Sequence, residues 1–179
     1  MKKIIIILTL LVAFLIYSDI KKDTITIPNT AIRLRVIPNS NSSQDQNIKN
    51  KVKSYLEKNT YELINKEEDI TTAREIIKEN IPLIEYNISK IFKENNYDMP
   101  YNVNYGYNYF PEKTYRGITY DEGYYESIVI SIGASEGDNW WCVLFPNLCL
   151  ADYKNNDDKE YKLWVVETIK KYFNNKSIH

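Results

Sequence analysis

Tyrosine recurs at alternate positions between Tyr101 and Tyr109, and this alternation limits the possible fold more than any other feature of the chain. The odd positions of the stretch are Tyr, Val, Tyr, Tyr and Tyr, and the even positions are Asn, Asn, Gly and Asn. Because successive side chains of a strand point to opposite faces, a period of two predicts a half-buried β-strand. Residues 127–133 alternate in the same way and place three isoleucines on one face.

Three other segments carry apolar side chains at helical spacing. The first begins after a capping residue at Asn41 or Ser42, the second at the capping box Thr72–Glu75, and the third at Asp157 or Asp158. The expected buried stripes are Ile48, Val52, Tyr55 and Leu56; Ile77, Ile81, Ile84, Ile88 and Phe92; and Tyr161, Trp164, Val165, Ile169 and Tyr172. Pro82 lies inside the second helix and predicts a kink or a break there.

Two further strands are expected, at Ile32–Ile37 and Cys142–Phe145, whereas residues 110–117 and 121–123 are rich in turn-forming residues. The order is therefore strand, two helices, several strands and a last helix. Helices that are segregated from a run of strands indicate an α+β fold. We expect two layers, with a mainly antiparallel sheet and three helices, in a single extracytoplasmic domain over residues 30–179.

The N-terminal segment is typical of an exported protein. Two lysines precede an apolar run over residues 4–17, and residues 19–29 form a polar linker. At about 1.5 Å per residue, that run spans roughly 21 Å of a hydrocarbon core about 30 Å thick. No small-x-small cleavage triplet stands near Ser18. We expect residues 1–18 to be either a cleaved signal peptide or an N-terminal membrane anchor, which contacts the membrane if it is not cleaved.

Charge and histidine content argue against several classes of function. The formal net charge is −1, and the lysines are scattered among acidic and amide residues rather than gathered in a basic stripe, so nucleic acid is not an expected partner. The single histidine, His179, is the last residue of the chain. Catalysis by Ser-His-Asp or Cys-His requires an oriented imidazole, and most zinc sites need histidines or more than two thiols. We expect no catalytic residue, metal or other cofactor.

Residues 133–137 match the G-x-S-x-G nucleophile elbow, but the match does not predict a hydrolase. The elbow opens into a helix and needs a histidine base. Here the motif is followed by Asp138-Asn139 and an aromatic run. A loop between two strands explains its glycines and small residues.

Two of the three tryptophans and both cysteines lie between Asp138 and Cys149. In an exported protein, Cys142 and Cys149 are candidates for a disulfide; two buried thiols, or a metal-binding or nucleophilic role, are the alternatives.

Five carboxylates flank the aromatic segments, a pattern that also occurs in glycan hydrolases, and the tyrosines raise the alternative of a carbohydrate-binding face. These carboxylates are Asp121, Glu122, Glu126, Glu136 and Asp138. Acidic residues in turns are usually solvated, and a tyrosine-rich strand is more often part of a half-buried sheet.

Several strings together resemble the stage II sporulation protein R family. They are Ile32–Ser40 with Asp45-Gln46, Phe110-Pro111-x-Lys113-x-Tyr115-x-Gly117, Gly123-x-Tyr125, Ile130-x-Ile132-Gly133, and Gly137–Pro146 with Cys149. The similarity extends over nearly all of residues 32–152.

This resemblance implies a signalling role without chemistry of its own. Proteins of that family are exported from the forespore into the intermembrane space, where they trigger a membrane-embedded aspartic protease of the mother cell to process the pro-form of sigma-E. Because peptidoglycan is remodelled in that space, a cell-wall-active enzyme or a peptidoglycan-binding module is the alternative. The family pattern names no contact residues. Because alternation puts Trp140 and Trp141 on opposite faces of an extended segment, we expect one in the core and one available to a partner. Our hypothesis is a partner-binding surface at Asp138, Asn139, Trp140 and Trp141, held in shape by residues 142–149.

Overall fold

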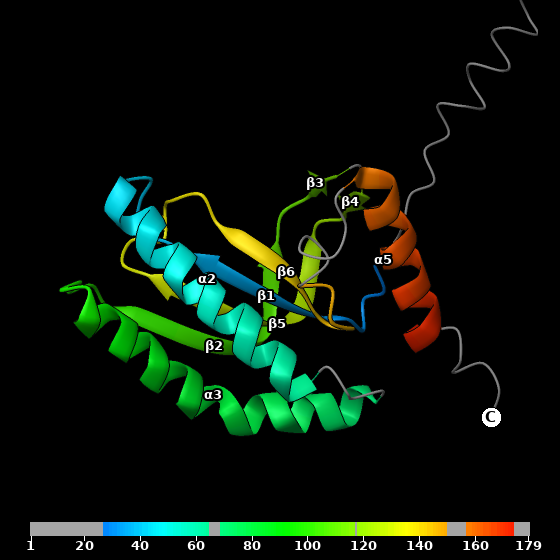
Figure 1. Ribbon diagram of the computed structural model, residues 1–179, viewed down its shortest axis with the longest axis horizontal. Coiled ribbons are helices and arrows are strands. Elements are labelled where there is room, and N and C mark those ends of the chain that lie inside the picture. The colour runs from blue at the N-terminus through cyan, green and yellow to red at the C-terminus, as the bar shows by residue number, and fades with distance from the viewer. Residues whose placement is uncertain (1–26, 65–68, 117, 150–156, 174–179) are drawn as a thin grey trace, which may run out of the picture.

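A mixed four-stranded sheet, covered on one face by two long helices, forms the body of the protein (Figure 1). The computed structural model describes residues 27–64, 69–116, 118–149 and 157–173. The expected signal or anchor segment at residues 1–18 lies outside these residues. The strands are β1 (Ile32–Ile37), β2 (Tyr101–Phe110), β3 (Lys113–Tyr115), β4 (Ile118–Tyr120), β5 (Gly123–Ile132) and β6 (Trp140–Phe145), and the helices are α2 (Ser43–Ile64), α3 (Ile70–Glu94) and α5 (Asp158–Phe173).

The strand order is β2-β5-β1-β6. β2 pairs antiparallel with β5, β1 pairs parallel with β5, and β6 pairs antiparallel with β1. The predicted α+β class with three helices and a mainly antiparallel sheet is confirmed, and the parallel pair lies at its centre. β3 and β4 form a separate two-stranded sheet; β3 lies within residues 110–117, which we expected to be rich in turns, and β4 lies between that segment and the one at residues 121–123. Strands of three residues are too short to show a period in the sequence.

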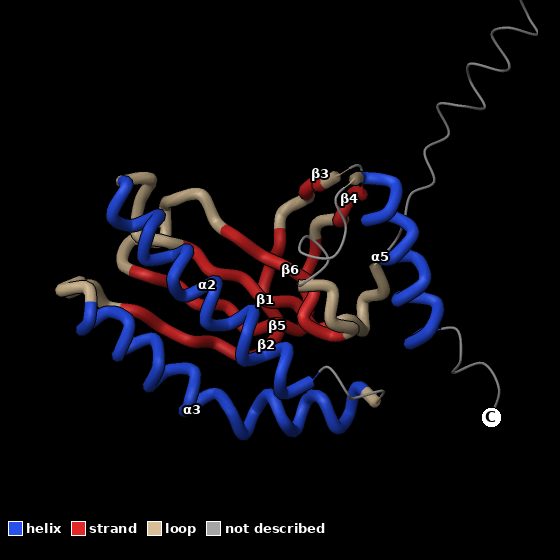
Figure 2. The backbone as a smooth tube through the Cα atoms, viewed as in Figure 1, coloured by secondary structure: helices blue, strands red, loops and turns tan. Residues whose placement is uncertain are grey.

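Helices α2 and α3 lie side by side over the same face of the sheet (Figure 2). The main core combines the predicted stripes of both helices with inward-facing residues of β1, β5 and β6. Its fully buried members include Leu34, Val36, Ile48, Val52, Leu56, Ile88, Ile128, Ile130, Ile132 and Leu144. α5 lies to one side and packs on a second cluster around Ile118, Tyr120 and Val143. Within the part of the chain that the structure describes, no helix is both long and apolar enough to cross a membrane.

The ends of the helices differ from the predictions in one case. Ser42 Oγ accepts from Asp45 N at 3.1 Å and Asp157 Oδ1 accepts from Glu160 N at 2.8 Å, as expected of capping residues. The capping box at Thr72 is wrong, because α3 begins at Ile70 and Asp69 caps it by accepting from Thr72 N at 2.9 Å. Of the kink or break predicted at Pro82, the break is excluded, since α3 continues through this residue.

Arg33 lies on the opposite face of the sheet and is buried, although the alternation of β1 placed it on a polar face. Its side chain is 1% exposed. The guanidinium stacks on Tyr125 at 3.3 Å from the ring centroid, with Phe110 and Trp141 at 5.4 Å. Burial lowers the pKa of Arg33, and interactions with Tyr125 oppose that change. Cation–π contacts therefore replace water around this charge.

Replacing Ile130 with alanine should test the packing of the sheet on the helices. Ile130 is fully buried and is paired with Val36 and Val103. We expect a loss of about 3 kcal/mol in the free energy of unfolding, measured by urea denaturation, because the truncation leaves a cavity. Leu83→Ala is the control, since Leu83 is 52% exposed on α3 and its loss should cost less than about 0.5 kcal/mol. Equal effects of the two changes would contradict the observed packing.

Candidate functional site

Two loops that are distant in sequence are hydrogen-bonded to each other beside the start of β6. The β1–α2 loop comprises residues 38–42, and the β5–β6 loop comprises residues 133–139. Main-chain N–H groups of Glu136 and Gly137 donate to the carbonyls of Asn39 and Pro38, both at 3.2 Å. Ala134 N donates to Asn39 Oδ1 at 2.9 Å. The segment that leads into Trp140 is therefore held along its length.

Glycine is required at two positions where these loops meet. Gly133 has a positive φ of 55°. A Cβ on Gly133 would lie 2.2 Å from Asn39 Oδ1, and a Cβ on Gly137 would lie 2.3 Å from the Ser40 carbonyl oxygen. These are the two glycines of the G-x-S-x-G match, so close approach of two loops explains both residues.

Asp45, in the first turn of α2, is the hydrogen-bonding centre of this region. Its side chain accepts from Asn39 Nδ2 at 2.9 Å, Ser40 Oγ at 2.5 Å and Tyr97 OH at 2.6 Å. Asp45 is 5% exposed. Burial alone raises the pKa of its carboxyl, but hydrogen bonds from Ser40, Tyr97 and Asn39 outweigh burial and bring the pKa to about 2. The same carboxylate raises the pKa of Tyr97, together with burial of that phenol.

Side chains of α2 and the β1–α2 loop hold the main chain of Asp138. Lys49 Nζ donates to the Asp138 carbonyl at 3.0 Å, and Gln46 Nε2 approaches the same oxygen at 3.5 Å. Asp138 N donates to Asn41 Oδ1 at 2.6 Å. The side chain of Asp138 is exposed and that of Asn139 is half-buried. These two residues thus have a fixed backbone while the Asp138 carboxylate faces solvent.

Trp140 and Trp141 lie on opposite faces of β6, as the alternation predicts. Trp140 packs against the main core under the helices. Trp141 packs on the other face, with its ring 4.9 Å from Tyr120 and 5.5 Å from Phe110. The expected division into one core indole and one free indole is wrong, because both side chains are half-buried. Each face of β6 has its own aromatic cluster, so each indole has an apolar neighbour.

Cys142 and Cys149 are joined by a disulfide, with their Cα atoms 5.1 Å apart. Leu148 N donates to the Val143 carbonyl at 3.0 Å, which brings the chain back beside β6. Next to the disulfide is a cavity of about 140 Å³. It is lined by both tryptophans, by both cysteines of the disulfide and by Lys53 and Lys113. The other lining residues are Tyr115, Tyr120, Asn139, Val143, Leu148 and Tyr161.

The lysines of this cavity, Lys53 and Lys113, were not expected as site residues, although Lys113 belongs to one of the strings that resemble the family. Lys53 Nζ lies 5.3 Å from the centroid of the Trp140 ring, and Lys113 Nζ lies 5.7 Å from that of Trp141. The spacing of Lys49 and Lys53, four residues apart on a predicted helix, is the one signal that could have indicated a basic helix face. Lys113 belongs to β3, which the sequence did not reveal.

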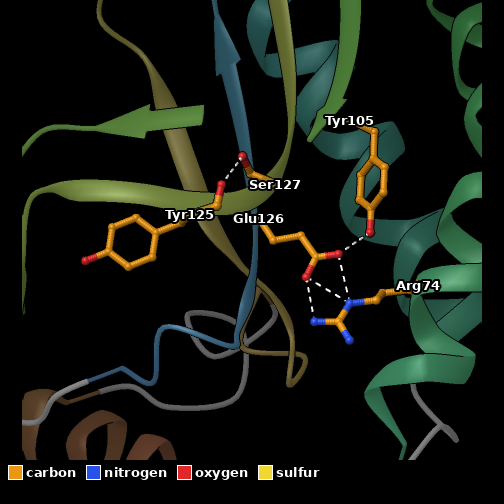
Figure 3. A network of polar contacts seen from close by, with 5 residues as sticks. All are labelled: Arg74, Tyr105, Tyr125, Glu126 and Ser127. Carbon is orange, nitrogen blue, oxygen red and sulfur yellow. Dashed lines mark hydrogen bonds and ion pairs between the residues drawn. The ribbon is translucent and has the colours of Figure 1, made fainter. Parts of the chain in front are cut away.

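Glu126 has a structural role, in contrast to the hydrolase alternative (Figure 3). Both of its carboxylate oxygens accept from Arg74 Nε at 2.9 Å, Oε2 also accepts from Arg74 Nη2 at 2.8 Å, and Tyr105 OH donates to Oε1 at 2.5 Å. Burial raises the pKa of Glu126, but the bonds from Arg74 and Tyr105 reverse this and lower it. A general acid needs a raised pKa instead.

Glu126 and Asp138 also do not form a carboxylate pair. Glu126 lies near the start of β5 and Asp138 lies beyond its end, so roughly 20 Å of strand separates them. Paired carboxylates of glycosidases lie within about 10 Å of each other. Among the described residues, no group of three or more His, Cys, Asp or Glu side chains is placed to hold a metal ion.

The fold and this site define a two-layer α+β domain with an aromatic edge strand, β6, whose preceding loop is held by hydrogen bonds. The family model for stage II sporulation protein R (spore_II_R) matches residues 28–155. Stage II sporulation protein R of Bacillus subtilis (strain 168) is 35% identical over 133 residues, which cover 74% of this chain and 59% of that protein. No solved structure matches significantly. The chain belongs to the stage II sporulation protein R family, and so to a family of sporulation proteins.

Asp45→Asn should destabilise the domain in a pH-dependent way. The folded pKa of about 2 is below the ordinary 3.8, so the ionised form stabilises the fold fully above about pH 4, and this stability is lost as the pH falls toward 2. We expect the variant to lose about 2 kcal/mol at pH 7, measured by urea denaturation, and the difference from the parent to shrink toward pH 2. A difference that does not change between pH 7 and pH 2 would contradict this role.

The disulfide can be tested by thiol titration of the denatured, unreduced exported protein. We expect no free thiol per chain, whereas two would exclude the bond. Replacing both cysteines with serine should lower the free energy of unfolding by about 2 to 3 kcal/mol, because the short loop is no longer closed in the unfolded chain. The reduced parent is the control. Its free energy of unfolding should agree with that of the double serine variant to within about 1 kcal/mol.

Proposed function

We propose that this chain is an exported signalling protein of sporulation. It passes from the forespore into the intermembrane space, where it triggers a membrane-embedded aspartic protease of the mother cell to process the pro-form of sigma-E. The observation that carries the proposal is the family match over residues 28–155, which includes every strand of the sheet and both braced loops. The apolar segment at residues 4–17 supports export, either as a cleaved signal or as a tether.

The role is that of a ligand rather than an enzyme. Neither carboxylate that a glycan hydrolase would use is suited to that role. Glu126 is already paired with Arg74, and Asp138 is exposed to solvent on a separate part of the domain. Asp138, Asn139, Trp140 and Trp141 instead form a short surface whose backbone is held by hydrogen bonds to Asn41 and Lys49 and by pairing with β1. A pre-ordered segment loses little conformational entropy when a partner binds, which suits a surface used for recognition.

Co-expression in a non-sporulating host tests this function directly. The chain is exported together with the protease and the pro-form of sigma-E, and each component is omitted in turn. We expect the mobility shift of the processed sigma factor only when all three are present. Processing without this chain, or none with all three, would refute the proposal.

The surface itself is tested in the same assay with Trp140→Ala and Trp141→Ala. Each variant removes a half-buried indole, so we expect a loss of about 2 to 3 kcal/mol in unfolding free energy, which leaves enough folded protein to compare signals at equal folded concentration. We expect at least tenfold less processing from one or both variants. Tyr86→Ala is the matched control, because Tyr86 is an exposed aromatic residue on α3, and it should signal normally. Normal signalling by both folded tryptophan variants would remove the surface from consideration.

A further inference from the structure

The outer edge of β6 has main-chain groups that point away from the sheet. In a strand, the N–H and C=O of one residue point to the same side, and the side alternates from residue to residue. The Val143 carbonyl accepts from Leu148 N, so it points away from β1. The N–H and C=O of Trp141, two residues earlier, share that direction. Outside the pairing of β6 with β1, neither group has a hydrogen-bond partner among the residues that the structure describes.

The cavity lies along this edge and reaches both faces of the strand. Trp140 lines it from the helix side and Trp141 from the opposite side. Each indole has an ammonium group near its ring, Lys53 on one face and Lys113 on the other. The edge is therefore flanked by one cation above the sheet and one below it.

Among the described residues around this edge, basic groups outnumber acidic groups. Lys49 and Arg35 add to Lys53 and Lys113, and these groups are close enough to repel one another. The acidic groups beside them are Asp138, which attracts Lys49 and Lys113, and Glu57, which lies 3.6 Å from Lys53 Nζ. Positive charge thus exceeds negative charge in this group of described residues, and an incoming anionic segment would reduce the repulsion.

We propose that the outer edge of β6, the edge strand of the described sheet, binds an extended acidic peptide segment by strand addition. The peptide main chain pairs with the N–H and C=O of Trp141, and the turn at residues 146–149 limits the added strand to a few residues. Adjacent side chains of a strand point to opposite faces, so two acidic residues next to each other place one carboxylate toward Lys53 and the next toward Lys113. In the setting of the proposed function, the segment belongs to the partner that is activated, and to that extent the inference rests on that proposal.

The binding test uses the full chain in a mild detergent and a synthetic threonine- and valine-rich nonapeptide with two adjacent glutamates at its centre. Binding is followed by tryptophan fluorescence and by isothermal titration. We expect Lys53→Gln and Lys113→Gln each to weaken binding by about fivefold, and the double variant by about 25-fold. Lys93→Gln, an exposed lysine on α3, is the matched control and should bind like the parent. A peptide with glutamines in place of the glutamates, and one methylated on its central main-chain nitrogens, should both bind at least tenfold more weakly.

Equal binding of the glutamate and glutamine peptides, or an unchanged affinity of the double lysine variant, would overturn the inference. Dimerisation of the chain through β6, seen by sedimentation and abolished by a charge change at Lys113, would overturn it in favour of a second copy as occupant. The co-expression assay separates this inference from the proposed function. If the parent and the double lysine variant both trigger processing equally, the function stands and the peptide site falls. If the peptide binds as described but the parent triggers no processing, the peptide site stands and the function falls.

Discussion

The buried carboxylate of Asp45 is the contact on which the arrangement of helices, sheet and loops around β6 depends. It receives hydrogen bonds from the β1–α2 loop through Asn39 and Ser40 and from Tyr97, which lies between α3 and β2. It also sits in the first turn of α2, where the helix dipole favours a negative charge. Because an unsatisfied buried acceptor costs about 1 to 3 kcal/mol, these three segments are held in one relative position.

That position decides what β6 presents to its surroundings. Asn39 and Pro38 bond the β5–β6 loop, Lys49 bonds the Asp138 carbonyl, and the strand that follows packs one half-buried indole against each of two cores. With both faces of β6 packed, the remaining feature is its edge, together with the lysines beside it. The shape of the proposed partner-binding surface is therefore a consequence of how distant segments meet, and its four residues would not hold this shape as an isolated peptide.

Much of the architecture follows from periodicity, and the errors have identifiable physical causes. The stripe at Ile77, Ile84 and Ile88 is buried as predicted because helical spacing reports directly on a packed face. The burial of Arg33 could not be read from β1, since its cover is an aromatic box assembled from β2, β5 and β6. In the same way, Glu126 looked like any acidic residue near a turn until α3 placed Arg74 against it.

The sequence by itself determined the three helices, the four strands of the main sheet, the opposite orientations of Trp140 and Trp141, the family, and the absence of a histidine from the body of the chain, because these follow from local spacing and residue identity. Only the tertiary structure decided that both indoles are half-buried, that Cys142 meets Cys149, and that lysines from α2 and β3 flank one strand edge. Such facts depend on contacts between residues far apart in the chain. They result from hydrogen bonding and burial between distant segments, and these interactions produce no periodic pattern in the sequence.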